Sequence, residues 1–227
     1  MGLLLALFGV FAGLALITFL TRQTVTEERG FAADAVSAVD VDVDVGNVTI
    51  VEEVRADVGL TMRIGSALLS KPDPTAELDG GTLVLRSDCP FFLAFSCRVD
   101  FALAVPTGSA LAVEVHSTAG NTDLTDIGGV IVVHTSAGNI TVTDFRGTEA
   151  TLSLSAGNIA FSSLEPPSQL QASTSAGNVE IVVPDEVYRV EAETSAGDSD
   201  VEVRQDPEST LVIEARTSAG NITIDRR

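Results

Sequence analysis

Few side chains in this sequence are placed to do chemistry, and a pair of cysteines comes first. Cys89 and Cys97 bracket the segment CPFFLAFSC. Zinc does not suit this spacing, because a zinc site needs four ligands and no CxxC pair or His-x-His cluster accompanies the two cysteines. Two interpretations stay open: a disulfide that closes a short loop, which fits an oxidising exterior, or two unpaired small residues in a core.

Two histidines and three aspartates are the next candidates. His116 and His134 occupy the same position in two copies of a repeat, so we expect them on one outer face, but two imidazoles are an incomplete metal site. Asp40, Asp42 and Asp44 alternate along one predicted strand and point the same way, which could collect a divalent cation. A charged strand face that resists aggregation is the favoured interpretation of these aspartates. We therefore predict no metal site and no cofactor.

Catalytic motifs are absent from the sequence. It contains no nucleophile elbow, no HExxH and no phosphate-binding loop of the Walker type. Asp123, Glu180 and Asp200 fall in one column of the repeat, but no basic residue joins them. We predict no catalytic residues and no enzymatic activity. The alternative is a solenoid enzyme that acts on polysaccharides, since such enzymes cluster acids on one outer sheet.

The composition excludes several classes of partner. The 227 residues carry 32 acidic against 13 basic side chains, for a formal net charge of −19, and Lys71 is the only lysine. Nucleic acid and polybasic membrane tethers both require clustered Lys and Arg, so we expect neither. Trp is absent and Tyr188 is the only tyrosine, which excludes a sugar-stacking platform of exposed indoles or phenols. The excess of arginine over lysine, with so many carboxylates, is typical of a salt-loving or GC-rich source.

An apolar segment opens the chain. Residues 2–20 contain no charge, and as a helix they would extend roughly 28 Å, which is enough to cross a bilayer. We predict a transmembrane anchor over residues 1–21, with a removed signal peptide as the alternative. Arg22 and Arg29 favour the cytoplasm for the domain after the anchor, whereas a disulfide favours the exterior. We expect a single-pass protein of the cell membrane whose β domain is extracellular, with residues 22–35 as a linker.

A repeat organises everything after residue 110. Six segments resemble IVVHTSAGNITV, and their glycines are separated by 18, 19, 20, 20 and 23 residues. A period near twenty residues is typical of one coil of a solenoid. The six glycines are Gly120, Gly138, Gly157, Gly177, Gly197 and Gly220.

Each segment predicts two strands joined by a sharp corner. Alternation places residues such as Val113 and Val115 toward the core before the corner, and Ile140 and Val142 toward the core after it. Glycine supplies the positive φ of the bend, and the Asn after it can bond local backbone or stack with its copy one coil away. We assign a structural role to these turn residues. They are Gly46, the six glycines above, and Asn121, Asn139, Asn158, Asn178 and Asn221.

Before residue 110 the β pattern continues less regularly. Residues 39–50 alternate almost perfectly around their own Gly46-Asn47 corner, whereas residues 70–81 predict a loop from their Pro and Gly content. Further strands are predicted over residues 58–64, 82–85 and 99–105. The predicted fold class is all-β: a single-stranded β-helix-like β-solenoid of about 20-residue coils over residues 36–227, preceded by one N-terminal transmembrane helix.

The sequence resembles a known family. The strand VDFALAVP at residues 99–106, then LAVEVHSTAGN, then the repeated TSAGNITI-type turns are similar to the bacterial and archaeal putative adhesin family of β-solenoid proteins, a domain of unknown function. The resemblance covers about residues 36–227. It implies a membrane-attached or exported stack of short strands, and it supplies no functional residues to carry over.

The predicted function is a surface-exposed, non-enzymatic module for adhesion or interaction at the cell envelope. Its predicted partners are the membrane, through the N-terminal helix, and another envelope or surface molecule. A self-assembling envelope scaffold is the alternative. The last coil ends at Arg226 and Arg227, shortly after Ile224, without a capping element, which would leave a solenoid end free for self-association.

Overall fold

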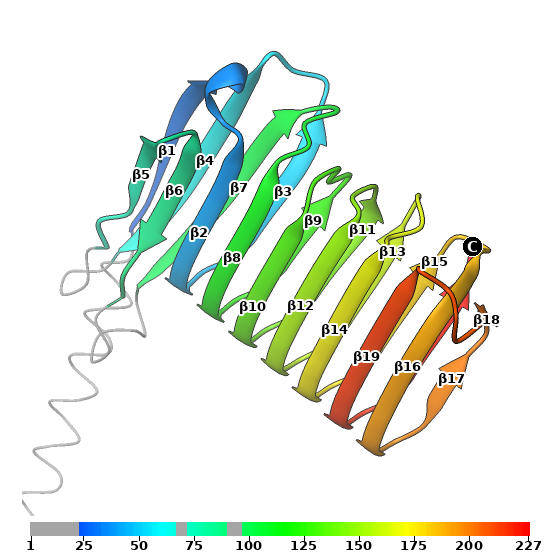
Figure 1. Cartoon of the computed structure of the whole chain (residues 1–227). Helices are drawn as coiled ribbons and strands as arrows, with labels where there is room; N and C mark the ends of the chain where they lie inside the picture. Colours follow the sequence, from blue (N-terminus) through cyan, green and yellow to red (C-terminus); the bar gives the residue numbers. More distant parts are fainter. Residues whose placement is uncertain (1–22, 67–71, 90–96) are drawn as a thin grey trace, which may run out of the picture.

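The protein folds into two long β-sheets that face each other along one axis (Figure 1). The structure is a computed structural model, and it describes residues 23–66, 72–89 and 97–227. Within them, strands dominate and the one helical element is the short 3-10 turn η1 (Ala33–Ala35). The all-β, solenoid-like prediction is confirmed. The described residues include no helix long and apolar enough to span a bilayer, and the predicted anchor at residues 1–21 lies outside them.

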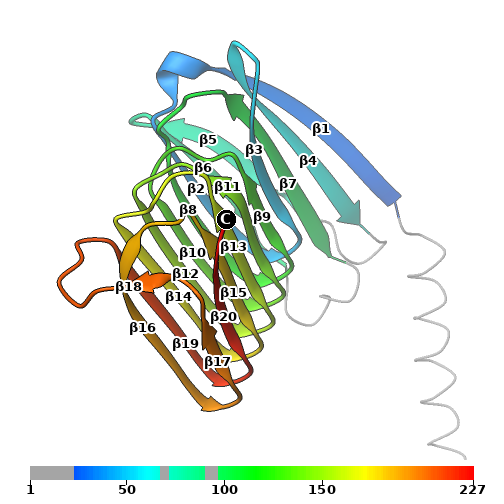
Figure 2. The ribbon, with the colours of Figure 1, turned by 90° about the vertical axis from the view of Figure 1, so that its right-hand side faces the viewer.

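Each sheet has ten strands. Sheet A contains, in spatial order, β1 (Gln23–Ala32), β4 (Asp57–Ser66), β7 (Arg98–Pro106), β3 (Val48–Glu53), β9 (Thr122–Thr125), β11 (Ile140–Phe145), β13 (Ile159–Ser163), β15 (Val179–Val183), β20 (Ile222–Arg226) and β17 (Ser199–Val201). Sheet B contains β18 (Arg204–Gln205), β16 (Val187–Ala196), β19 (Val212–Ala219), β14 (Gln169–Ala176), β12 (Glu149–Ala156), β10 (Ile131–Ala137), β8 (Ala112–Ala119), β2 (Ala38–Val45), β6 (Thr82–Ser87) and β5 (Thr75–Asp79). Each regular coil adds one strand, or rung, to each sheet, and Figure 2 shows the two layers side by side.

Parallel pairing in register stacks equivalent residues on one another. Ile131 pairs with Val113 on one side and with Ala150 on the other, and all three are at most 2% exposed. Because successive side chains of a strand alternate between faces, the same register fills the space between the sheets with apolar residues. The predicted inward positions Val115, Val133, Ile140, Val142, Ile159, Phe161, Val179, Ile181, Ile213, Ala215, Ile222 and Ile224 are all buried.

The corner glycines are required by conformation and by close packing. The seven predicted corner glycines have φ between 134° and 157°, a region that side chains with a Cβ rarely adopt. At Gly138 an added Cβ would overlap the carbonyl oxygen of Gly120, one rung away. The repeated Ala-Gly-Asn corner therefore lets neighbouring coils approach to the spacing of a β-sheet.

Strands close the N-terminal end where the sequence predicted irregular structure. Residues 22–35 were expected to form a linker, but β1 pairs antiparallel with β4, from Gln23 opposite Ser66 to Ala32 opposite Asp57. Nearly every residue of β1 is exposed, so the strand has no alternation of buried and exposed residues for the sequence to reveal. The expected loop over residues 70–81 likewise contains β5, which pairs antiparallel with β6.

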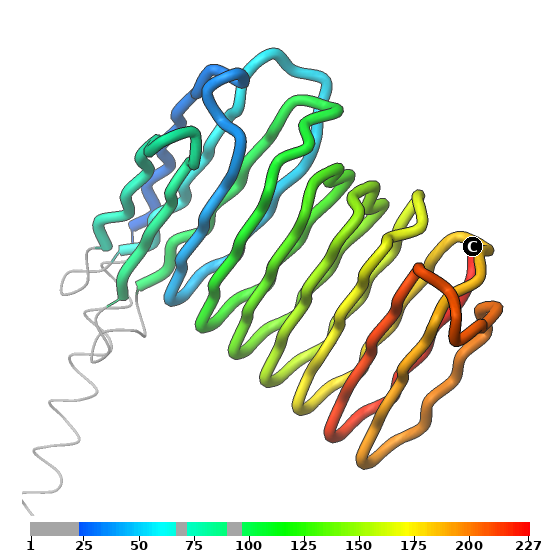
Figure 3. The backbone as a smooth tube through the Cα atoms, viewed as in Figure 1, coloured from blue at the N-terminus to red at the C-terminus, as the bar shows by residue number. Residues whose placement is uncertain are grey.

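The last two coils stack in reverse of their sequence order. β19 lies between β14 and β16, and β20 lies between β15 and β17, so the last coil is inside the stack and the coil before it forms the end (Figure 3). The expectation that the last coil forms the open end is therefore wrong. Polarity explains the order, because Ser199 stands where the last coil has Ile222, and a polar coil loses less at an end.

Candidate functional site

A disulfide joins the two sheets near the N-terminal end. Cys89 and Cys97 are bonded, with Cα atoms 5.7 Å apart, and no free cysteine occurs among the described residues. Cys89 follows β6 of sheet B and Cys97 precedes β7 of sheet A, so the bond ties the two layers together. The backbone N–H of Cys89 donates to the Asp44 carboxylate at 2.8 Å, which fixes the position of the bond on the stack.

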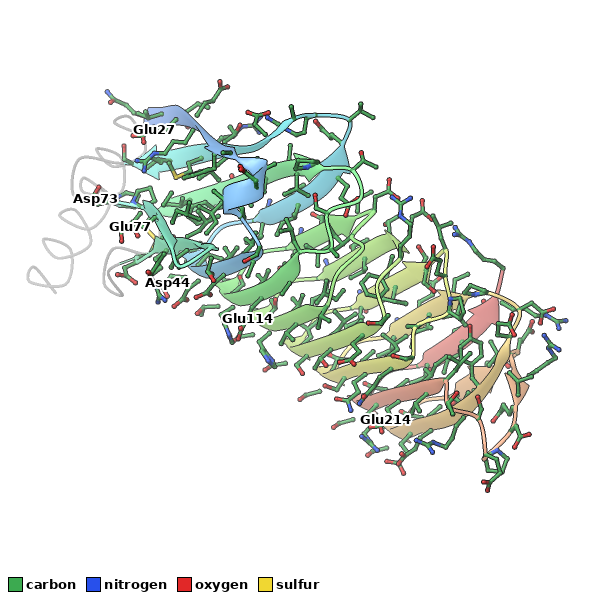
Figure 4. The ribbon with its side chains drawn as sticks, turned by 45° about the horizontal axis from the view of Figure 1, so that its top comes forward. Glu27, Asp44, Asp73, Glu77, Glu114 and Glu214 are labelled. Atoms are coloured by element: carbon green, nitrogen blue, oxygen red, sulfur yellow. A yellow bond between two sulfur atoms is a disulfide. The ribbon has the colours of Figure 1, made fainter. Side chains whose placement is uncertain are left out.

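The three alternating aspartates of β2 have separate partners. Arg86 on β6 forms ion pairs with Asp40 at 3.5 Å and with Asp42 at 3.6 Å. Asp44, which Figure 4 labels near the N-terminal end of the stack, accepts the Cys89 N–H. Asp40 and Asp42 therefore balance one arginine, and the three carboxylates do not converge on a single point where a cation would bind.

The two histidines lie one rung apart on the outer face of sheet B. Their rings stack with centroids 5.2 Å apart and planes 18° from parallel, and His116 Nε2 lies 2.9 Å from a Glu114 carboxylate oxygen. Asp42 precedes them in the column and Ser153 follows. They line an open trough of 370 Å³ whose other residues are mostly serine and threonine. Among the described residues, no three His, Cys, Asp or Glu side chains are placed to hold a metal ion.

The acids predicted on sheet A share a column without forming a cluster. From Asp123 the register runs through Thr141 and Ala160 to Glu180, and Thr223 separates Glu180 from Asp200. At about 4.8 Å per rung, Asp123 and Glu180 are about 14 Å apart. Glycoside hydrolysis needs two carboxyl groups within roughly 5 to 9.5 Å, so this spacing does not suit a pair of Asp123 with Glu180.

The corner asparagines form a continuous ladder of hydrogen bonds along one edge of the stack. Asn139 N–H donates to the side-chain oxygen of Asn121 at 3.0 Å, and Asn158 N–H donates to that of Asn139 at the same distance. Asp100 accepts at the start of the ladder and Asp198 donates its N–H to Asn221 at the end. The ladder follows the spatial order of the coils, including the reversed pair, so its role is to hold neighbouring corners together.

An ion-pair cluster near the other end was not predicted. Arg216 on β19 contacts Glu191 at 2.7 Å, Glu193 at 3.4 Å and Glu214 at 3.1 Å. The hydrogen bond that Arg216 donates to Glu191, the charge of Glu191 and the bonds that Arg216 donates to the other two acids raise the pKa of Arg216. Figure 4 labels Glu214 on this part of the outer face. All four residues stand at outward positions of two neighbouring strands, and the register places Glu191 beside Glu214 and Glu193 beside Arg216.

A buried carboxylate was also missed. Glu52 on β3 is 7% exposed, and its two oxygens accept the N–H of Gly108 at 2.8 Å and the N–H of Gly128 at 3.2 Å. It therefore connects the end of β3 to the loops that follow β7 and β9. The sequence gives no signal for this role, because Glu52 stands beside Glu53 in an ordinary strand end.

Solved structures share this architecture. A putative cell adhesion protein from Clostridium sporogenes ATCC 15579 is similar over 90% of this chain and 100% of its own, at 14% identity and a TM-score of 0.53. A putative adhesin from Bacteroides fragilis NCTC 9343 is similar over 90% of this chain and 97% of its own, at 14% identity and a TM-score of 0.39. The first likeness supports the fold. No protein with a curated description matches the sequence.

A family model also matches the sequence. The Toastrack DUF4097 model matches residues 99–227, from β7 to the end of the chain. This region is more than half of the sequence and contains all six TSAGN-type segments. The chain belongs to the Toastrack DUF4097 family.

Proposed function

We propose that this protein is anchored in the cell membrane by residues 1–21 and presents its solenoid outside the cell as a non-enzymatic module for adhesion or interaction. The outside location is supported by the Cys89–Cys97 disulfide, since such bonds persist in oxidising compartments. Adhesion is the role that the name of the similar Clostridium sporogenes protein carries. It comes to this chain as a proposal, because that likeness supports the fold alone.

The observation that carries the proposal is the outer face of sheet B. At its centre, β10, β12 and β14 present His134, Ser153 and Ser173 in one in-register row. Charged clusters lie on either side of this row, around Arg86 and around Arg216. The neutral centre offers hydrogen-bonding groups repeated at about 4.8 Å, which suits contact with an extended polar partner. A small substrate would instead need a concave pocket that buries most of its surface.

A self-assembling scaffold is the second candidate, and the end of the stack formed by β16, β17 and the two-residue edge strand β18 favours it. The half-buried core residues Val190, Ala192 and Val201 at this end would be covered by another coil. Sedimentation of the chain in detergent distinguishes the candidates, because filaments that grow with concentration support a scaffold and a discrete species supports a binding module.

Adherence of cells tests the proposed function. Cells that produce the full chain should attach to surfaces or to one another better than cells that produce only residues 1–35. We expect Ser153→Asp with Ser173→Asp, on the outer face of sheet B, to reduce attachment severalfold. Unchanged attachment without the solenoid would refute the adhesion role.

A matched control lies on the opposite sheet. Thr125→Asp with Thr143→Asp adds the same two charges, one rung apart, to the outer face of sheet A, on β9 and β11. We expect it to leave attachment unchanged. Equal losses for the two double variants would show that charge in general, and not the face of sheet B, controls attachment.

A further inference from the structure

The last coil fills a slot between two other coils of its own chain. β19 separates β14 from β16, and β20 separates β15 from β17. The chain therefore leaves a rung empty when it passes from β15 to β16, and the last coil enters that rung afterwards or together with them. Because the last coil enters this slot after the chain has passed it, the last coil of another chain can fill the slot in the same way.

The contacts that hold the last coil are those of the repeat in general. Asn221 N–H donates to Asn178 at 2.9 Å, and Asp198 N–H donates to Asn221 at 3.0 Å. The Thr217 hydroxyl donates to the carbonyl oxygen of Gly177 at 3.0 Å. The same kinds of bond recur at other rungs, for example between Asn158 N–H and the preceding ladder residue. The slot therefore recognises a coil by its corner and not by the chain to which it belongs.

The connection into the last coil is short and lies at the end of the stack (Figure 3). Residues 206–211 join β18 to β19. Three hydrogen bonds join this segment to β16: Asp206 N–H donates to Tyr188 O at 3.0 Å, the Ser209 hydroxyl donates to Val187 O at 2.7 Å, and Arg189 N–H donates to Leu211 O at 2.8 Å. When this connection straightens, the bonds within it and to β16 are lost. The last coil, however, regains all its contacts when it enters the slot of a second copy. This balance is the physical basis of exchange between identical chains.

We propose that two copies of this chain exchange their last coils, so that β19 and β20 of each copy occupy the slot of the other. In one chain the N-terminal strands lie at the end of the stack opposite β16 and β17 (Figure 1). Two stacks joined at their β16–β17 ends therefore carry their N-terminal strands at opposite ends of the pair. Given the proposed surface location, on which this consequence rests, such a pair connects two membranes. A second copy of the protein thus becomes a partner in the proposed function.

The ion pairs of the last coil are kept on exchange. Glu191 and Glu193 are exposed on β16. Arg216 travels with the last coil and is the group that neutralises these acids, at 2.7 and 3.4 Å. Exchange brings the arginine of one copy to the acids of the other and leaves each ion pair made.

Cross-linking between two single-cysteine variants tests the exchange. Gln171 on β14 is the register neighbour of Glu214 on β19, whereas Glu191 on β16 lies one rung beyond Glu214. Full-length Gln171→Cys and Glu214→Cys chains, unfolded together in detergent and refolded at high concentration, should form a disulfide-linked heterodimer. We expect at least tenfold more of it than from Gln171→Cys mixed with Glu191→Cys. Equal yields from the two mixtures, or no heterodimer in the first, would overturn the exchange.

The wild-type chain provides a second measurement that needs no variant. After refolding at high concentration, exchanged dimers should survive dilution for hours, because separation requires the last coils to leave their slots. A population that is monomeric throughout, or one that dissociates at once on dilution, contradicts the proposal. Both measurements use purified protein, so their failure is distinguishable from failure of the adhesion role, which is read on cells.

Discussion

Single residues at the corners connect each coil to the next. Each glycine accepts a positive φ and leaves room for the carbonyl oxygen of the previous corner, and each Asn oxygen accepts the N–H of the next. Asp100 and Asp198 terminate the ladder, and Asn occupies the positions between them. These repeated residues therefore serve to hold neighbouring coils together.

Gly138→Ala should destabilise the protein by at least about 2 kcal/mol, because the new Cβ meets the carbonyl oxygen of Gly120 at a φ of 142°. Gly80→Ala is the matched control, since Gly80 has a φ of 57° and open space around it, and should cost about 1 kcal/mol. Denaturant unfolding monitored by circular dichroism measures both. A loss at Gly138 no larger than that at Gly80 would contradict the close-packing argument.

Tyr188 should make the folded protein less stable at alkaline pH. Burial, followed by the charges of Glu186 and Asp185, raises the pKa of its phenol from 10.0 to about 12. Between these two values the unfolded chain has lost a proton that the folded chain keeps, so the free energy of unfolding falls as pH rises. The fall due to this residue should be roughly 2 kcal/mol across that window.

Tyr188→Phe should remove this part of the pH dependence. At neutral pH the variant loses only the hydroxyl bond to Pro184 O, which is 3.0 Å long, at a cost of about 1 kcal/mol. Urea unfolding of both proteins between pH 10 and pH 12 gives the slopes. If the variant destabilises as steeply as the wild type, other groups set the alkaline limit.

At the scale of elements, the order of the last two coils is the least expected feature. The two coils share the TSAG corner, but the penultimate coil has Asp198 and Ser199 where the last coil has Asn221 and Ile222. The structure places the more polar coil at the solvated end and the more apolar coil inside. Hydrophobic burial thus overrides sequence order.

Intramolecular cross-linking distinguishes the two orders. A double variant with Gln171→Cys and Glu214→Cys should form an internal disulfide readily, since these residues are register neighbours. Gln171→Cys with Glu191→Cys should not, because β19 lies between their strands. Peptide mapping at low protein concentration identifies the bonds. Preferential bonding of the second pair would show that the coils stack in sequence order.

Sequence patterns predicted the regular coils well and the ends poorly. The alternation around each corner placed Val113, Val115 and Ile140 in the core correctly, because those strands are buried on one face. The strand β1 escaped prediction, since its residues are exposed and only pairing with β4 keeps it extended. The cluster around Arg216 escaped for another reason: the repeat gives the outward column, but it does not show which charged side chains of neighbouring strands contact one another.

The charge of −19 is a property of the whole molecule. Acidic side chains lie on outward positions of the sheets, as Glu114 and Glu214 do on sheet B (Figure 4), around a core of stacked apolar residues. Such a shell keeps the faces of different molecules apart and opposes folding through self-repulsion. The few arginines are placed where carboxylates gather, as Arg86 and Arg216 are, and they offset part of the repulsion.

Salt should stabilise the folded protein. Raising the salt concentration from about 0.1 M to about 1 M shortens the screening length from about 10 to about 3 Å, which weakens repulsion between exposed carboxylates. We expect the free energy of unfolding to rise by about 1 kcal/mol or more, with Tm rising by roughly 2 to 4 °C per kcal/mol for a domain of this size. Maximal stability at low ionic strength would contradict this account and the inference of a salt-loving source.

The central claim, that the solenoid stands outside the cell, can be tested at one residue. Val54 lies between β3 and β4 and is 100% exposed, so Val54→Cys should react with a membrane-impermeant maleimide wherever the domain is accessible. The wild-type chain is the control, because its Cys89 and Cys97 are bonded to each other. We predict that intact cells label the variant as fully as lysed cells and leave the wild type unlabelled. Labelling of the variant only after lysis would place the solenoid inside and contradict the account.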